Sequence, residues 1–330
     1  MPTIGDVKSQ RIAVFLVVSV TATGCSGSGD ATQPSPEDQG PALSYLALFP
    51  EQHAAIVGDH VTLQVTARDL SGADLTDVTP EFTISDSSVV RVEAGGLVVS
   101  TGVGTATVRA SAGGRAAEAT FYVGSPTYDL ATLGPPRVLS ASYIDLSKIG
   151  RVSRFRSTVG HSYVDGSGET CRSMKHYFEP KASEDWTKVD VYAPASGTIW
   201  HIAPDGAFGY RVLLAPRDLP ALEVQIFHVN LDPDIVVNTW VDAGDHIGTH
   251  SSSLTMSDIA VSVGSKEEGT LISYFETMTD GVFAEYQARG VSSREAAVIT
   301  KEERDADPVP CEGETPFTVQ GTLPDWLDLS

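Results

Sequence analysis

Two histidines, two carboxylates and one cysteine lie within residues 160–178, GHSYVDGSGETCRSMKHYF. His161 and Asp165 are four residues apart and offer an imidazole and a carboxylate, both of which are metal ligands. Cys171 and His176 offer a different chemistry, a thiol nucleophile beside a base. Cys171 could also hold a polar loop through a disulfide. The stretch alone leaves a metal site, a cysteine catalytic site and a structural bridge open.

The residues after 140 are rich in strand patterns. We expect strands at 190–204, 209–216, 222–230 and 258–265, with the turn VDAGDHIG (241–248) between the last two. Short helices are expected late in the chain. Ser292 with Glu295, and Thr300 with Glu303, both have capping-box spacing.

Residues 42–124 predict an all-β sandwich. HVTLQVTAR (60–68) alternates apolar and polar residues, and GTATVRAS (104–111) and AEATFYVG (117–124) do the same. Turn sequences such as LSGAD, EAGG and SAGG separate these segments at the spacing of a sandwich.

This first segment resembles the bacterial Ig-like group 2 (BIG2) domain. The resemblance rests on VGDHVTLQVTARDLSGADLTDV and FTISDSSVVRVEAGGLVVSTGVGTATVRA, with Phe82 in place of the family's usual tryptophan. It implies a spacer or adhesive module without catalytic residues. We expect His53 and His60 to be solvated or edge positions.

The second segment, over about 155–265, resembles the M23 metallopeptidases, the lysostaphin- and LytM-like family. Four motifs carry the resemblance in chain order: His161-x3-Asp165, VYAPASGTI (191–199), Phe227-His228-Val229 and VDAGDHIG (241–248). The fifth motif departs from the family pattern. Where the family has His-x-His, this chain has Met256-Ser257-Asp258.

The resemblance implies a zinc site with His161, Asp165 and Asp258 as ligands, leaving one position open for water. Two carboxylates in the set would also suit a harder ion such as Mn²⁺ or Ca²⁺. Hydrolysis needs a base and an oxyanion donor, and the Met256 thioether supplies neither. His228 and His176 are the candidates for these catalytic roles. The alternative is an M23-like domain that keeps its groove without turnover.

The N-terminus predicts a targeting segment. Lys8 and Arg11 precede IAVFLVVSV (12–20), which is too short to span a bilayer and fits a signal-peptide core. The following residues, Ala22 to Cys25, resemble the lipobox of bacterial lipoproteins, which implies lipidation of Cys25 and a membrane anchor. Plain secretion is the alternative. Ser26 next to the lipid cysteine is compatible with outer-membrane sorting.

The chain has three cysteines, at 25, 171 and 311. If lipid takes Cys25, an even pair remains in an oxidising compartment. The simplest assignment is then one disulfide, Cys171–Cys311. A catalytic Cys171 would have to avoid that bond, and no G-x-S-x-G pattern offers a serine nucleophile instead.

Acidic residues outnumber basic ones, 43 to 22. This excess argues against nucleic acid or an anionic membrane surface as the partner. The expected partners are peptidoglycan or envelope proteins, with the membrane reached through the lipid anchor.

Together these features predict an all-β protein: an Ig-like β-sandwich followed by an M23-like antiparallel β domain with a few short helices. The expected segments are a signal peptide, a tether, the BIG2 domain, a linker and the M23-like domain with a C-terminal extension, at 1–25, 26–41, 42–124, 125–140 and 141–330. The predicted function is an envelope lipoprotein, on the periplasmic or cell-surface side, that acts on or binds peptidoglycan. A zinc metalloendopeptidase lacking His-x-His, a non-catalytic binding or hydrolase-regulating module, and a surface adhesin or scaffold are the alternatives.

Overall fold

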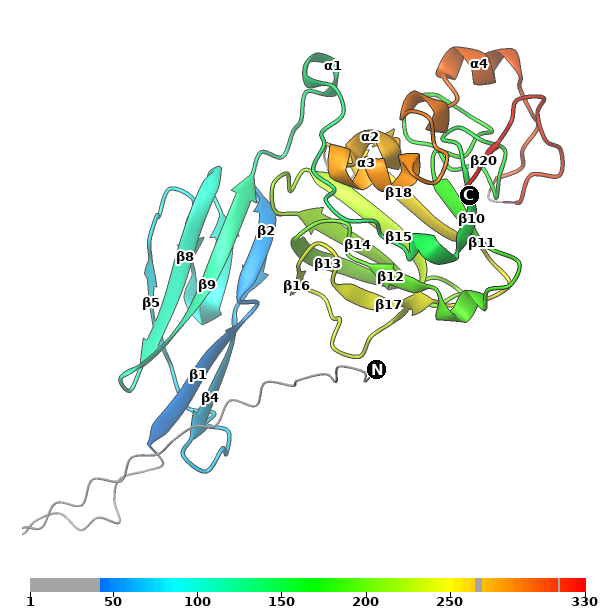
Figure 1. Cartoon of the computed structure of the whole chain (residues 1–330). Coiled ribbons are helices and arrows are strands. Elements are labelled where there is room, and N and C mark those ends of the chain that lie inside the picture. The colour runs from blue at the N-terminus through cyan, green and yellow to red at the C-terminus, as the bar shows by residue number, and fades with distance from the viewer. Residues whose placement is uncertain (1–41, 265–268, 314) are drawn as a thin grey trace, which may run out of the picture. The chain divides into compact units, whose positions relative to one another are not determined.

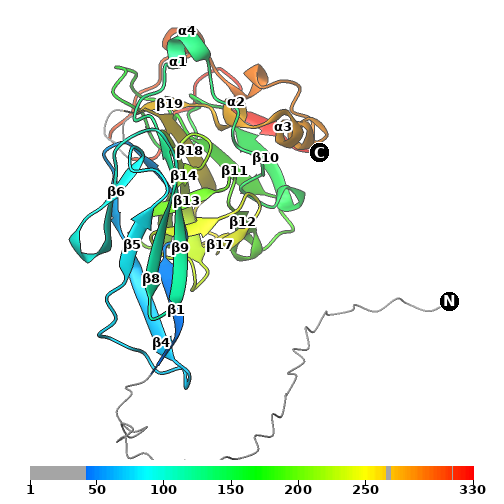
Figure 2. The same cartoon turned by 90° about the vertical axis from the view of Figure 1, so that its left-hand side faces the viewer.

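The computed structural model describes residues 42–264, 269–313 and 315–330. Strands dominate these residues, and the helices are few and short (Figures 1 and 2). The all-β prediction is confirmed. The predicted signal peptide, lipidation at Cys25 and tether lie outside the described residues. Within the described residues no helix is long and apolar enough to cross a membrane.

Residues 43–124 form a four-stranded sheet, a three-stranded sheet and a two-stranded ladder. The first has the order β2-β9-β8-β5, the second β3-β7-β6, and the third pairs β1 with β4. The strands are β1 Leu43–Phe49, β2 Gln52–Ile56, β3 His60–Thr62, β4 Gln64–Asp69, β5 Glu81–Ile84, β6 Val90–Val92, β7 Leu97–Ser100, β8 Gly104–Ala112 and β9 Arg115–Gly124.

The alternation expected in this segment produces its core. Val108 and Phe121, on neighbouring strands β8 and β9, are 0% and 1% exposed, and Phe82 packs against the same cluster. The expected strand at 60–68 divides at Leu63 into β3 and β4, whose neighbours lie in different sheets. His53 lies in β2, the outer strand of its sheet, so it is an edge position, but it is buried and not solvated; His60 is exposed, as predicted.

Residues 149–328 contribute a single sheet of eleven strands. Its main order is β16-β13-β14-β15-β18-β11-β10-β20, with β17 on β12 and β15, and β19 on β18; every pair is antiparallel. The strands are β10 Ile149–Ser153, β11 His176–Pro180, β12 Asp190–Tyr192, β13 Gly197–Pro204, β14 Tyr210–Pro216, β15 Leu222–Leu231, β16 Thr239–Val241, β17 His246–His250, β18 Ser257–Val263, β19 Thr270–Ile272 and β20 Trp326–Asp328.

The helices are α1 Leu130–Leu133, α2 Tyr274–Thr277, α3 Asp280–Gln287 and α4 Lys301–Ala306. Of these, α2 and α3 lie against this sheet (Figure 1). Tyr274, Phe275 and Tyr286 from α2 and α3 are fully buried and join Phe178 of β11 and Ile259 of β18 in one apolar core.

The two expected helix starts differ in outcome. Thr300 and Glu303 form the predicted capping box at the start of α4. Ser292 does not cap a helix; a 3₁₀ turn at Glu295–Ala297 follows Arg294, and Ser293 accepts a hydrogen bond from the Ala296 amide instead.

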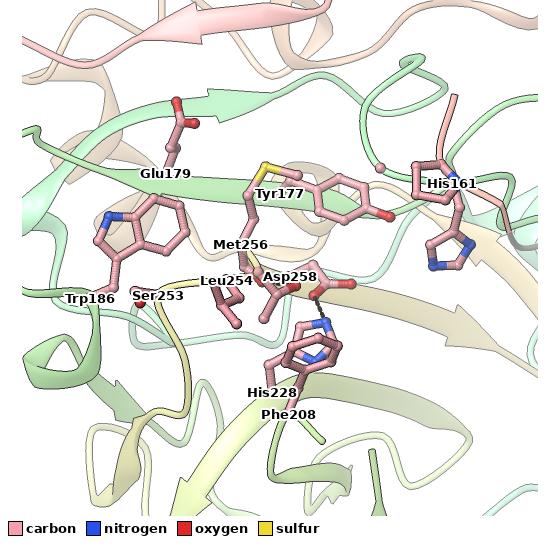
Figure 3. Close-up of a pocket in the computed structure, with 13 residues that line it drawn as sticks. His161, Tyr177, Glu179, Trp186, Phe208, His228, Ser253, Leu254, Met256 and Asp258 are labelled. Atoms are coloured by element: carbon pink, nitrogen blue, oxygen red, sulfur yellow. Dashed lines mark hydrogen bonds and ion pairs between the residues drawn. The ribbon is translucent and has the colours of Figure 1, made fainter. Parts of the chain in front are cut away.

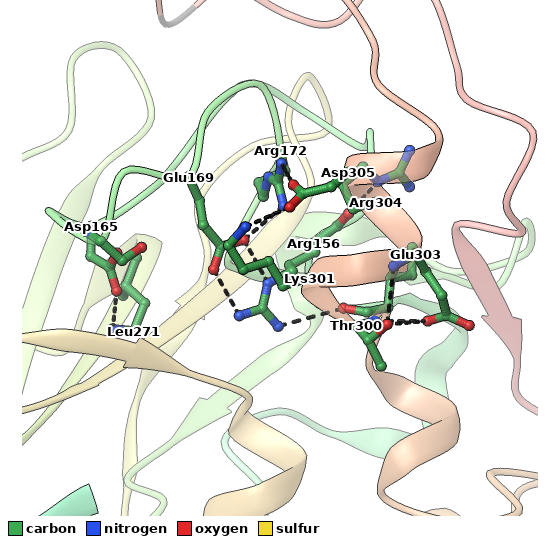
Figure 4. Close-up of polar contacts among 12 residues, drawn as sticks. Arg156, Asp165, Glu169, Arg172, Leu271, Thr300, Lys301, Glu303, Arg304 and Asp305 are labelled. Atoms are coloured by element: carbon green, nitrogen blue, oxygen red, sulfur yellow. Dashed lines mark hydrogen bonds and ion pairs between the residues drawn. The ribbon is translucent and has the colours of Figure 1, made fainter. Parts of the chain in front are cut away.

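The predicted disulfide Cys171–Cys311 is present, with a Cα–Cα distance of 5.2 Å. Buried ion pairs hold the same part of the chain together. Glu169, almost fully buried, pairs with Arg156 and Arg172, and Arg172 reaches Asp305 of α4 (Figure 4). The segment that follows α4 is therefore fastened to the loop before β11 by a covalent bond and by charge.

We expect loss of the disulfide to lower the free energy of unfolding by about 2–5 kcal/mol, since the bond closes a loop of 140 residues. Urea denaturation of the Cys171→Ala/Cys311→Ala variant measures the effect. The native protein in dithiothreitol serves as the chemical control. Unchanged urea midpoints in both samples would contradict a stabilising bridge.

Candidate functional site

A pocket of about 610 Å³ opens on the sheet beside β15 and β18 (Figure 3). Aromatic side chains form much of its wall, and His228 and Asp258 lie at its floor. The lining residues are Gly160, His161, Tyr177, Glu179, Trp186, Phe208, His228, Ser253, Leu254, Thr255, Met256, Asp258 and Pro316.

A β-bulge directs His228 into this pocket. Between the pairs Val212–Ile226 and Tyr210–Val229, one residue of β14 faces two residues of β15, Phe227 and His228. His228 has φ +61°, a left-handed conformation that costs a non-glycine residue of order 1–2 kcal/mol. Such backbone strain persists where the surrounding structure holds it, and it gathers at functional sites.

Asp258 of β18 is fully buried, and both of its carboxylate oxygens have a cationic partner. Oδ2 lies 2.8 Å from the Lys175 ammonium, and Oδ1 lies 3.1 Å from His228 Nε2. The other ring nitrogen of His228, Nδ1, lies 2.9 Å from Asp205 Oδ2. The floor is therefore a chain of four alternating charges: Lys175, Asp258, His228 and Asp205.

These contacts shift the pKa values of His228 and Asp258. Burial alone would lower the pKa of His228, but the carboxylates of Asp205 and Asp258 outweigh it and raise that pKa to about 9. Burial would raise the pKa of Asp258, but Lys175 and His228 hold it below its ordinary value. At neutral pH His228 is an imidazolium and Asp258 a carboxylate.

Of the two residues in the His-x3-Asp motif, His161 lies at the pocket wall. Its Nδ1 is 2.9 Å from the Ser162 carbonyl, and its backbone pairs with Pro316. Gly160, with φ +68°, makes this possible, because a Cβ there would lie 2.3 Å from the Tyr177 ring.

The Asp165 carboxylate accepts hydrogen bonds from backbone amides and does not line the pocket. Its Oδ1 accepts from the Ser167 amide at 2.9 Å, and its Oδ2 accepts from the Leu271 amide at 2.8 Å (Figure 4). It is not among the residues that line the pocket. Its carboxylate fixes local backbone, the use that aspartate commonly has in turns.

The predicted ligand set of His161, Asp165 and Asp258 is therefore not assembled. No group of three histidine, cysteine, aspartate or glutamate side chains among the described residues is arranged to hold a metal ion. Asp258 already neutralises a lysine and an imidazolium, and Asp165 bonds backbone amides. The residues present do not fit a zinc centre.

His176, predicted as a catalytic residue, lies in the core at 1% exposure. Its Nδ1 is 2.8 Å from the Ser153 carbonyl and its Nε2 2.9 Å from Ser273 Oγ. It packs against Phe155 and Phe275, and burial lowers its pKa to about 4. It does not line the pocket, so its place supports a structural role.

Cys171 is in the disulfide, so the alternative of a Cys171–His176 nucleophilic pair has no free thiol. His250 is also buried; it lies against Trp186 with ring centroids 5.8 Å apart.

Sequence reasoning missed three contributors to the site: Lys175, Asp205 and Trp186. Lys175 lies within residues 160–178, but a lone lysine beside His176 belongs to no motif. Asp205 lies in the turn after β13, and Trp186 in the 3₁₀ helix Trp186–Lys188 before β12. Only the fold brings them to β15 and β18.

No family model and no curated protein matches this sequence. Among solved structures it is similar to Helicobacter pylori Csd3, with 14% identity over 54% of this chain and 44% of that one and a TM-score of 0.30. A putative peptidase M23 from Pseudomonas aeruginosa has 17% identity, coverage of 59% and 86%, and a TM-score of 0.26. A zinc-containing peptidase from Vibrio cholerae has 11% identity, coverage of 66% and 78%, and a TM-score of 0.33.

At these low values the likeness assigns neither a family nor an activity to this chain. The chain also spans less than half the length of Csd3.

Because His176 is buried, we expect the stability of the fold to decrease at acidic pH. Its pKa is lowered from 6.5 to about 4, so between these values the unfolded chain binds the proton and the native chain does not. The stability that His176 contributes is present above pH 6.5 and is lost as the pH falls toward 4. Urea midpoints of the native protein and His176→Gln between pH 4 and 7 measure it. The native protein should lose up to about 3 kcal/mol more than the variant; parallel curves would contradict the assignment.

For His228 we expect the opposite dependence of stability on pH. Its pKa is raised to about 9, so its contribution is fully present below pH 6.5 and is lost as the pH rises through 9. An NMR titration of the histidine ring carbons should show one imidazole titrating near 9, and Asp205→Asn should lower that value. A His228 titration near 6.5 in the native protein would contradict the ion pairs at the floor.

Proposed function

We propose that residues 141–330 form a divergent M23-like module that binds peptidoglycan in the described pocket without hydrolysing it. The N-terminal targeting segment would hold the protein in the bacterial envelope, and residues 42–124 would act as a BIG2-type spacer. Zinc-dependent cleavage is the competing proposal.

The positions of the motifs support an M23-like module. VYAPASGTI runs from β12 into β13, and VDAGDHIG leads from β16 into β17. Phe227 and His228 lie on β15, and Asp258 lies on the neighbouring β18. His161, His228 and Asp258, which come from three of the motifs, thus meet at one pocket although they are separated in the sequence.

One observation carries the non-catalytic part of the proposal: the ionisable groups at the floor neutralise one another. A general base needs a free lone pair toward a water or a substrate proton. Carboxylate oxygens lie 2.9 and 3.1 Å from the two ring nitrogens of His228, and its raised pKa keeps it protonated at neutral pH. Met256 beside it has no basic atom. The floor is built to hold charge in place rather than to move a proton.

The walls suit a ligand with flat, partly apolar faces. Trp186, Phe208 and Tyr177 contribute aromatic rings, and the exposed Leu254 stands at the pocket with them (Figure 3). Aromatic side chains bury large apolar faces, while a few polar groups orient a ligand. Sugar rings and the short peptide stems of peptidoglycan present both kinds of surface.

The test is sedimentation with purified sacculi. The native protein should pellet with sacculi, and Trp186→Ala should weaken this binding about tenfold, because truncating a central aromatic anchor costs of order 1–2 kcal/mol. Tyr210→Ala is the matched control, since Tyr210 is 43% exposed and does not line the pocket. Equal retention of the native protein and Trp186→Ala would contradict binding at the pocket.

The same incubation tests for cleavage. Soluble fragments should not appear above a protein-free control, with or without added zinc. Release of fragments that depends on the native protein and is lost in His228→Ala would replace this proposal with the metalloendopeptidase.

A further inference from the structure

We propose that Lys175 is a built-in substitute for a metal ion. Its ammonium supplies beside Asp258 the positive charge that a bound divalent cation would supply, and it excludes such a cation from the centre. This inference concerns what holds the pocket floor together, and it is independent of what the pocket binds.

Strand geometry places Lys175 at the centre. Tyr177 of β11 pairs directly with Asp258 of β18, so their side chains share a face of the sheet. Lys175 directly precedes β11, which begins at His176, and its ammonium reaches the Asp258 carboxylate. His176 instead packs in the core between Phe155 and Phe275. The lysine and not the neighbouring histidine therefore meets Asp258.

The Lys175 side chain is almost fully buried and is enclosed by contacts on several sides. The Lys175 side chain is 3% exposed and the Asp258 side chain 0%, and Nζ lies 2.8 Å from Oδ2. Aromatic rings enclose the ammonium: its nitrogen lies 3.7 Å from the ring centroid of Phe227, 4.4 Å from that of Tyr163 and 5.8 Å from that of Tyr177. Cation–π attraction to these rings offsets part of the lost hydration of the ammonium.

The charges explain why a cation is required. A fully buried carboxylate without a partner is strongly unfavourable. The Lys175 ammonium, 2.8 Å from Oδ2, supplies the positive charge beside Asp258. A divalent ion bound to that oxygen would lie next to the ammonium and would have to displace it.

The experiment uses the full chain and compares the native protein with Lys175→Ala. Metal content is measured by elemental mass spectrometry. Thermal midpoints are measured with EDTA, with ZnCl₂ and with ethylammonium chloride, the amine acting as a probe for the deleted side-chain end. Lys188→Ala is the matched lysine control, since that side chain is 79% exposed.

We expect the native protein and Lys188→Ala to contain no stoichiometric metal and to keep their midpoints in EDTA and in ZnCl₂. Lys175→Ala should melt lower, and zinc or ethylammonium at about 100-fold above its dissociation constant should raise its midpoint by roughly 5 °C or more. The double variant Lys175→Ala/Asp258→Asn should not respond to either cation, because the carboxylate that requires a cation is gone.

Two results would overturn the proposal. One is stoichiometric metal in the native protein whose removal lowers the midpoint. The other is a folded Lys175→Ala that responds to no cation. If Lys175→Ala does not fold, the double variant decides: its recovery of a cooperative transition supports the charge requirement, and its failure to fold contradicts it.

Discussion

The ion pair between Lys175 and Asp258 is the interaction on which the pocket depends. It joins β11 to β18 at the centre of the sheet and is out of contact with water. A buried pair of this kind adds little stability beyond an apolar pair of the same size, but breaking it leaves a buried charge and costs about 3–5 kcal/mol. Its effect is therefore to specify an arrangement: with Asp258 neutralised on one side, the carboxylate orients His228 on the other.

The rest of the site is arranged around this pair. The bulge in β15 turns Phe227 toward the ammonium and His228 toward the carboxylate, at the cost of a left-handed backbone at His228. The loop before β11 places His161 at the pocket wall. The disulfide and the ion pair between Arg172 and Asp305 connect this loop to the C-terminal segment. Pro316 of that segment also lines the pocket. The disulfide and the Arg172 ion pairs thus fix one edge of the pocket, and the Lys175–Asp258 ion pair fixes its floor.

The sequence predicted the strands better than the site. Period-two patterns located the strands around His228 and Asp258, because side-chain alternation is a local signal. The disulfide followed from counting cysteines. The His-x3-Asp spacing misled: Asp165 bonds the amides of Ser167 and Leu271, and the second of these contacts joins residues 106 positions apart. Neither Lys175 nor the bulge at His228 has a local signature, since both depend on the register between strands that are distant in sequence.

A double-mutant cycle tests whether Lys175 and Asp258 act as a unit. Lys175→Met, Asp258→Asn and the double variant would be compared by urea denaturation near pH 7. We predict that each single variant loses several kcal/mol of unfolding free energy and that the double variant is more stable than the sum of the two losses by at least about 2 kcal/mol. Additive losses would show that the lysine and the aspartate do not act as a unit, and the assignment of Lys175 as the cation of this centre would then be wrong.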